Sequence, residues 1–171
     1  EFGVYGVQLW YHANGVDESN VHVPYKPKSK GLGNSQVLPR DYVKQQEIEL
    51  VLSEMAEQVA IRLRAIRKKT TTVSISIGYS RFEESTSFRG QMKIEPTNQT
   101  EELQKYVISL FRKKYNGGAV RSISVFYSSF VDENITMLSL FDGPEEILKK
   151  ERLQTAIDAI RSQFGFTTLQ K

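Results

Sequence analysis

The apolar residues of this chain change their spacing near residue 72, and that change limits the folds open to it. Before this point, apolar side chains recur at steps of three or four residues, which places them on one face of a helix. They are Ile48, Leu52, Met55, Val59, Leu63 and Ile66. From Val73 to Tyr79, apolar residues alternate with small polar ones, which is the period of a strand with one apolar face. The sequence therefore predicts a buried helix that leads into a half-buried strand.

Further elements are predicted on both sides of this pair. Residues 88–95 alternate in the same way and follow a short acidic link, which predicts a hairpin. A helical pattern over 103–111 is stopped by Asn116-Gly117-Gly118. Residues 120–130 are rich in β-branched and aromatic side chains, and residues 35–40 are predicted as a short first strand. The order β-α-β-β-α-β indicates an α+β domain, with two helices on one face of a four-stranded antiparallel sheet.

Two helices on one face leave the other face of the sheet uncovered, so its outward side chains are informative. The outward residues are small or carry hydrogen-bond donors: Ser74, Ser76, Ser80, Arg81, Arg89, Gln91, Lys93, Arg121, Ser122 and Ser124. Among the outward residues of these strands, only Glu95 is acidic. Small residues let a phosphate backbone approach closely, and donors can bind its oxygens. The pattern favours a nucleic-acid partner, while a solvated sheet face with no partner is the alternative.

Charge is distributed unevenly along the chain. Residues 26–131 carry 18 basic and 10 acidic side chains, whereas residues 1–25 carry three acids and residues 132–146 carry five, with no Lys or Arg in either flank. A basic middle segment is typical of a polyanion partner, although uneven surface charge can also occur without one. The absence of cysteine excludes disulfides and thiolate metal sites. No apolar run approaches the roughly 20 residues of a membrane span.

One helix is predicted on each side of this α+β domain. Residues 7–13 form a possible short helix that ends at Gly15, and the start without Met suggests a piece of a longer protein. Pro144 can begin a C-terminal helix that ends at Gly165. Its predicted apolar face is Leu153, Ile157, Ile160 and Phe164.

No catalytic signature is found along the sequence. The chain has no phosphate-binding glycine loop, no nucleophile elbow and no metalloprotease motif. Nucleotidyl transfer needs carboxylates clustered on one rigid site around two metal ions, and the acids here fall on predicted helix surfaces or in turns. His12 and His22 are too few for a histidine-rich metal centre, and we expect both to be surface or packed residues. We expect no catalytic residue, no metal site and no cofactor in these residues.

Four stretches, in order, resemble the end of the thumb and the little finger of Y-family DNA polymerases, in particular the bacterial UmuC-like branch. They are Leu9–Asp17, Lys28–Gly31, Ser35–Tyr42 and a C-terminal part formed by Leu138–Asp142 and Lys149–Gly165. The resemblance covers nearly the whole chain. It implies that residues 1–34 are the end of the thumb and a linker, residues 35–131 the little finger, and residues 132–171 a clamp-binding-like segment and a C-terminal helix.

The resemblance also implies a function. The little finger of these translesion enzymes grips primer-template DNA through its phosphate backbone, so this chain should bind DNA and catalyse nothing. The catalytic carboxylates and their Mg²⁺ belong to an upstream palm domain. A cytoplasmic, nucleoid-associated protein with no membrane partner is expected. The implied DNA contacts are Lys28, Lys30, Asn34, Gln36 and Arg40 from the first strand and its approach, and Ser74, Ser76, Arg89, Gln91, Lys93 and Arg121 from the later strands. Phe126 departs from the basic residue that many relatives carry near this position.

Residues Met137, Leu138, Ser139, Leu140 and Phe141 resemble the pentapeptide with which bacterial polymerases bind the sliding clamp. Leu140 and Phe141 would enter an apolar pocket on the clamp. Met137 stands where Gln is usual, and its thioether cannot make the hydrogen bonds of an amide. Packing of these apolar residues against the domain is the alternative.

Two other functions remain open. A sheet that reads single-stranded RNA would need aromatic rings on the open face of its central strands. Tyr79, Phe88 and Tyr127 alternate in step with the core residues and so fall on the same face of their strands, which leaves only Phe126 pointing outward. A protein-interaction module would be expected to expose an apolar patch instead of a face of Ser, Arg and Lys.

Overall fold

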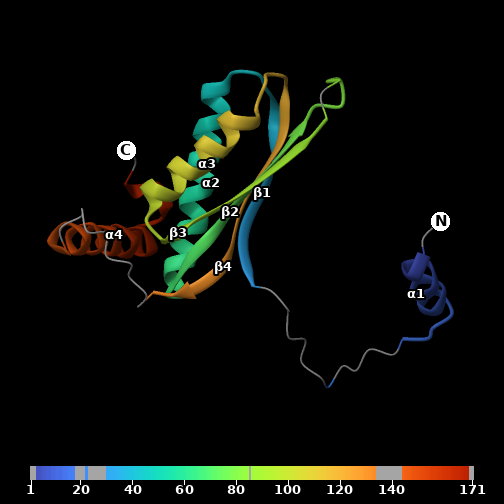
Figure 1. The fold of residues 1–171 in the computed structure, drawn as a ribbon, viewed down its shortest axis with the longest axis horizontal. Coiled ribbons are helices and arrows are strands. Elements are labelled where there is room, and N and C mark those ends of the chain that lie inside the picture. The colour runs from blue at the N-terminus through green and yellow to red at the C-terminus, as the bar shows by residue number, and fades with distance from the viewer. Residues whose placement is uncertain (1–2, 18–21, 23–29, 85, 134–143, 170–171) are drawn as a thin grey trace.

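The helices and strands follow the order predicted from the sequence. The computed structural model describes residues 3–17, 22, 30–84, 86–133 and 144–169. In chain order the elements are α1 (Gly3–Ala13), β1 (Gly31–Tyr42), α2 (Gln45–Ala65), β2 (Lys68–Tyr79), β3 (Phe88–Thr97), α3 (Thr100–Lys114), β4 (Val120–Asp132), α4 (Pro144–Phe164) and the 3₁₀ turn η1 (Phe166–Thr168). The stretch from β1 to β4 has the order β-α-β-β-α-β (Figure 1).

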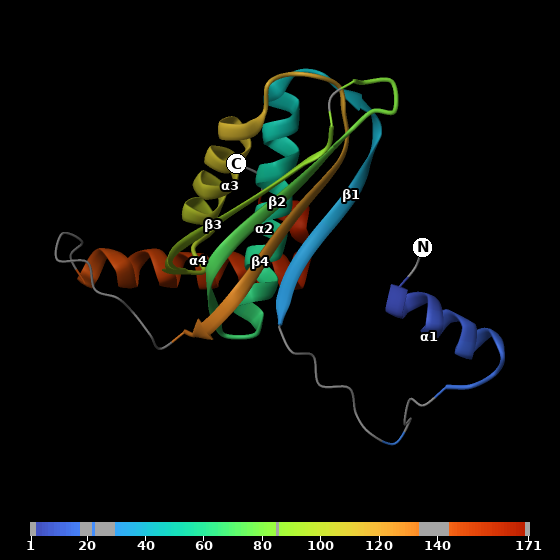
Figure 2. The ribbon, with the colours of Figure 1, turned by 45° about the vertical axis from the view of Figure 1, so that its right-hand side comes forward.

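The four strands form one sheet in the order β1-β4-β2-β3, with every neighbouring pair antiparallel. The helices α2 and α3 lie side by side on one face of this sheet, as Figures 1 and 2 both show. The predicted fold class, an α+β domain with two helices on one face of a four-stranded antiparallel sheet, is confirmed. None of the described helices is long and apolar enough to cross a membrane.

The hydrophobic core lies between the sheet and these two helices. The buried apolar residues of α2 are Ile48, Leu52, Met55, Ala56, Val59, Ala60 and Leu63, and those of α3 are Leu103, Val107, Leu110 and Phe111. Tyr127 of β4 is completely buried, and its hydroxyl donates to the Ala56 carbonyl oxygen at 3.1 Å. Burial raises the pKa of this hydroxyl far above its ordinary value, so the group stays a neutral donor and satisfies a carbonyl inside the core.

One bidentate ion pair joins the two helices at the surface. Arg112 of α3 donates from Nε and Nη2 to the two carboxylate oxygens of Glu49 on α2, at 2.8 and 2.6 Å. Gln45 donates to the same carboxylate at 2.6 Å. These hydrogen bonds, that from Arg112 above all, lower the pKa of Glu49 against the opposing effect of burial. Glu49 is therefore held ionised in the folded protein at pH values where the unfolded chain begins to take up protons.

The Glu49→Gln variant should lose stability at neutral pH and resemble the wild type in acid. A lowered pKa stabilises the fold above the ordinary glutamate value of 4.5, and this contribution disappears as pH falls through the folded-state pKa. Urea unfolding at a series of pH values measures the difference. Glu54→Gln, which changes an exposed residue of the same helix, is the control. A Glu49→Gln difference that persists undiminished well below pH 4 would contradict this origin of the pKa shift.

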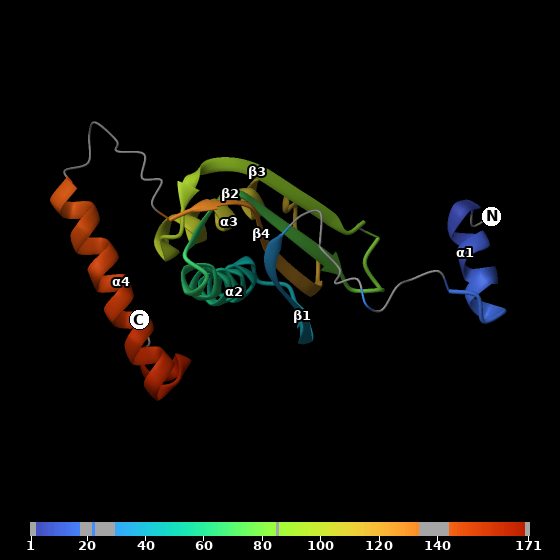
Figure 3. The same ribbon diagram turned by 90° about the horizontal axis from the view of Figure 1, so that it is seen from below.

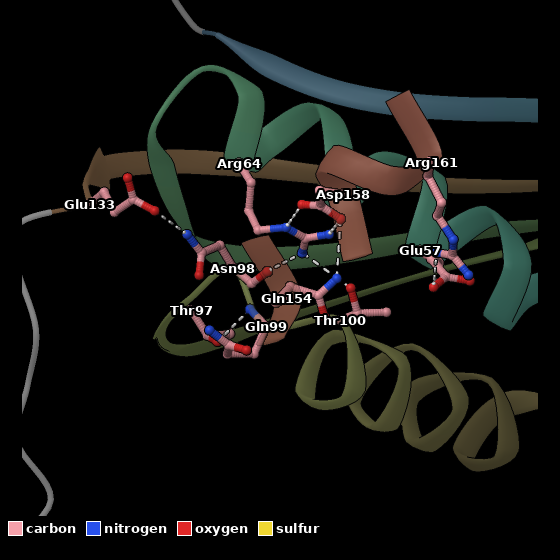
Figure 4. Close-up of polar contacts among 10 residues, drawn as sticks. All are labelled: Glu57, Arg64, Thr97, Asn98, Gln99, Thr100, Glu133, Gln154, Asp158 and Arg161. Carbon is pink, nitrogen blue, oxygen red and sulfur yellow. Dashed lines mark hydrogen bonds and ion pairs between the residues drawn. The ribbon is translucent and has the colours of Figure 1, made fainter. Parts of the chain in front are cut away.

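The helix α4 packs against the helical layer through charged residues, which differs from the predicted apolar face. Leu153 and Phe164 are 62% and 65% exposed. Instead, Asp158 receives two hydrogen bonds from Arg64 of α2, from Nε at 2.5 Å and from Nη2 at 2.9 Å (Figure 4). Arg161 donates to Glu57 of α2 at 2.5 Å. Figure 3 shows α4 beside α2 on the side away from the sheet.

Two boundaries near the N-terminus also differ from prediction. The first helix begins at Gly3 rather than at residue 7, and it has no buried residue: Leu9 and Trp10 are 61% and 63% exposed. The first strand begins at Gly31 rather than at Ser35, because Gly31, Leu32 and Gly33 pair with Ser128, Tyr127 and Phe126 of β4. Glycines that resemble a linker in the sequence are therefore part of the sheet.

Candidate nucleic-acid interface

The strand register brings all five predicted contacts of β2 and β3 onto one face of the sheet. Three successive rows cross that face from β1 to β3, and we call these residues the open face: Gly31–Ser128–Thr72–Lys93, Gly33–Phe126–Ser74–Gln91 and Ser35–Ser124–Ser76–Arg89. Their strand neighbours Val73, Ile75 and Val125 are buried beneath α2 and α3. The open face is the side of the sheet that these helices leave uncovered (Figure 2).

The composition of the open face changes from its centre to its β3 edge. The centre consists mainly of Ser and Thr, whose hydroxyls donate and accept hydrogen bonds and take little space. The β3 edge carries the exposed side chains of Arg89, Gln91 and Lys93. Lys114 of α3 holds the backbone beneath this edge, because its Nζ donates to the Arg89 carbonyl oxygen at 2.7 Å. A shallow polar surface bordered by cations can receive a polyanion.

Asn34 and Gln36 of β1 lie on the opposite side of that strand from the open face. They pair with Val125 and Ile123 of β4, which are core residues. The Asn34 side-chain amide donates to Gln58 Oε1 of α2 at 2.7 Å. The first strand instead contributes Ser35, whose hydroxyl lies 2.8 Å from the hydroxyl of Ser124. The alternation of the apolar Leu32 with Gly31 and Gly33 in the sequence would have indicated that Asn34 and Gln36 share the core side of the strand with Leu32.

Two of the predicted cations lie next to carboxylates. Arg40 donates to Glu47 at 3.1 Å, and its guanidinium lies 4.6 Å from the centre of the Tyr42 ring. Arg121 lies 3.6 Å from Asp41. The register passes from Gly78↔Ser122 to Tyr79↔Val120, which leaves Arg121 on a bulge. These pairs offset part of the positive charge at this end of the sheet, so Arg89 and Lys93 provide the stronger cationic edge.

Of the remaining predicted residues, the structure describes Lys30. Lys30 is exposed immediately before Gly31. Lys28 and the clamp-like residues Met137, Leu138, Ser139, Leu140 and Phe141 lie outside the described residues. Their predicted contacts stay predictions.

Phe126 is the open-face residue that does not fit a surface of phosphate contacts. It occupies the middle row, and its side chain is 45% exposed. The aromatic residues Tyr79 and Phe88 lie on the helix side, where the Tyr79 ring stacks on Tyr115 and contacts Phe88. An RNA-reading sheet with several stacking rings therefore has little support, because the described residues of β2 and β4 present one ring on the open face.

Carboxylates and histidines are dispersed among the described residues. No group of three or more of them that could hold a metal ion is found there. Four carboxylates of the described helices, Glu47, Glu49, Glu57 and Asp158, are instead paired with arginines.

Known proteins match this chain over most of its length. Residues 29–140 match the impB/mucB/samB family C-terminal domain. UvrX of Bacillus subtilis, a protein named for UV-damage repair, is 40% identical over 166 residues, which cover 96% of this chain and 39% of UvrX. A protein named DNA polymerase IV 2 is 35% identical in Bacillus subtilis and 33% identical in Halalkalibacterium halodurans. The chain spans about two fifths of the length of these relatives.

The matched region includes β1 to β4 and thus the whole open face. Both the domain match and the relatives agree with the resemblance to Y-family polymerases found in the sequence. The chain therefore belongs to the impB/mucB/samB family of Y-family polymerases and carries the C-terminal domain of that family at residues 29–140.

Proposed function

We propose that this chain is the DNA-gripping part of a translesion DNA polymerase and that its open face binds the phosphate backbone of primer-template DNA. The observation that carries the proposal is the register that lines up Arg89, Gln91 and Lys93 along one edge of a serine-rich, uncovered sheet. Hydroxyls and cations on a flat surface suit phosphate oxygens, which are the same in every sequence. The relatives named DNA polymerase IV 2 support DNA as the partner.

A fluorescence-anisotropy titration with labelled primer-template DNA tests the proposal. We expect the 171-residue chain to bind weakly, to bind unrelated sequences equally well, and to lose affinity steeply as salt rises through counterion release. Binding that is insensitive to salt, or that depends on one base sequence, would contradict a grip on the phosphate backbone.

We infer that polymerase chemistry and its Mg²⁺ belong to the part of the relatives that this chain does not match. The chain spans about two fifths of their length, and its open face offers hydroxyls, amides and cations rather than clustered carboxylates. With Mg²⁺ and all four nucleotides, the chain should extend no primer.

The segment Met137–Phe141 is our candidate for a second contact, with the bacterial sliding clamp. The proposal rests on its resemblance to clamp-binding peptides and on its place between β4 and α4, in an acidic stretch that does not favour DNA. Calorimetric titration with the clamp should detect binding, and Leu140→Ala/Phe141→Ala should abolish it while DNA affinity stays unchanged. A double variant that still binds the clamp would show that this segment is not the contact.

A further inference from the structure

The side chain of Phe126 extends over the neighbouring strand β1, and its ring lies above Gly31 and Gly33. A Cβ atom added at Gly31 would lie 2.2 Å from Phe126 Cζ and 2.7 Å from Cε1. One added at Gly33 would lie 2.5 Å from Phe126 Cδ2. The two glycines therefore leave free the space that side chains would otherwise occupy on the open face of β1, and the ring fills it. One side of the ring is supported by the strand, and 45% of the side chain remains accessible.

The side chains around the ring are small and polar. Its neighbours along β4 on the same face are Ser124 and Ser128, and its partner on β2 is Ser74. None of these side chains is large enough to extend above an aromatic ring. The accessible part of Phe126 is therefore a flat apolar spot within a surface otherwise suited to phosphate.

The row of the open face that contains Phe126 also carries polar side chains that can hydrogen-bond a phosphate. Ser74 is adjacent to Phe126, and Gln91 lies one strand further. At about 4.8 Å between neighbouring strands, the backbone of Gln91 lies about 10 Å from that of Phe126, and the ring extends in the other direction, over β1. A nucleotide held at its phosphate by Ser74, on the strand next to Phe126, could thus place its sugar and base towards the ring.

We propose that Phe126 is a stacking platform for an unpaired base of single-stranded DNA. Bases in a duplex stack on one another and keep their faces hidden, so the ring can take only a base that has left the helix or lies in a single-stranded template. Stacking on an aromatic ring is tolerant of sequence because every base has a π-face. The inference rests on the proposed DNA function and adds to it a second kind of ligand site on the same face.

The test compares the wild-type chain with Phe126→Leu, which keeps apolar cover over Gly31 and Gly33 but removes the π-face. Leu50→Ala, which truncates an exposed apolar residue on α2, is the control. The probes are single-stranded oligothymidine and a fully paired duplex of equal length. We expect Phe126→Leu to weaken single-strand binding about tenfold, within the range for loss of one stacked base, and to change duplex binding less than twofold.

A photocrosslink locates the contact independently of affinity. Oligothymidine that carries 5-iodouracil should crosslink to Phe126 in the wild-type chain, and the crosslinked peptide should disappear in Phe126→Leu. If the duplex binds but Phe126→Leu leaves single-strand affinity unchanged and the crosslink falls elsewhere, the ring only shields the glycine edge of β1, and stacking is refuted while the backbone grip stands. If the wild-type chain binds neither DNA, the proposed function itself fails.

Discussion

Replacing Arg89 and Lys93 together by glutamine should reduce the affinity for primer-template DNA at least tenfold and lower its dependence on salt. Both side chains are exposed and stand at the β3 edge of the open face, in register with Ser76 and Thr72. Each cation that neutralises a phosphate releases counterions, so losing two contacts should reduce the slope of log affinity against log salt by about two.

The matched control is Lys105→Gln/Lys113→Gln, which removes the same charge from exposed positions on α3. This pair lies on the helical layer, away from the open face, so its binding should change little beyond the effect of net charge. Anisotropy titrations at several salt concentrations measure both quantities. Equal losses of affinity and slope in the two double variants would show that net charge alone, and not the open face, determines binding.

Asp158→Ala should release α4 from the helical layer. The Asp158 carboxylate accepts two hydrogen bonds from Arg64, and only 11% and 20% of the Arg64 and Asp158 side chains are exposed. Removing one member of a largely buried pair leaves the other charge without its partner, at a cost of about 3 kcal/mol. Arg64 keeps its bonds to the Asn98 carbonyl oxygen and the Thr100 hydroxyl, so the rest of the domain should remain folded.

Hydrogen exchange measures this release directly. In Asp158→Ala, the amides of α4 should exchange much faster, while those of α2, β2 and β4 keep their protection. Ser162→Ala is the control, because Ser162 is exposed and bonds within its own helix to the Ala159 carbonyl oxygen. Unchanged exchange along α4 in Asp158→Ala would mean that other contacts hold this helix.

The sheet and its two covering helices were predictable because their apolar periods are strong. The spacing from Ile48 to Leu63 and the alternation from Val73 to Ile77 each bury one face of one element, so the same pattern fixes both the structure and the direction of its side chains. The open positions of β2 and β3 followed from that alternation, and this is why Ser74, Ser76, Arg89, Gln91 and Lys93 lie on one face as predicted.

Other features depend on contacts that a local pattern does not contain. Gly31 and Gly33 belong to β1 because they pair with Ser128 and Phe126 of β4, and the Phe126 ring occupies the space that side chains would take there; both are tertiary relations between residues more than 90 positions apart. Asn34 and Gln36 were assigned by resemblance, whereas strand parity directs them to the helix side. The apolar spacing of α4 predicted an apolar contact. The surface of α2 that faces this helix carries Arg64 and Glu57, so α4 contacts it through the charged residues Asp158 and Arg161.

Amide chemical-shift mapping of the chain during a titration with duplex primer-template DNA reports which face of the sheet receives DNA. We expect DNA to bind the open face, with the largest changes at Ser74, Ser76, Arg89, Gln91 and Lys93 and little change at Lys105 and Ser109 on α3. Changes concentrated on α3 and absent from β2 and β3 would contradict it.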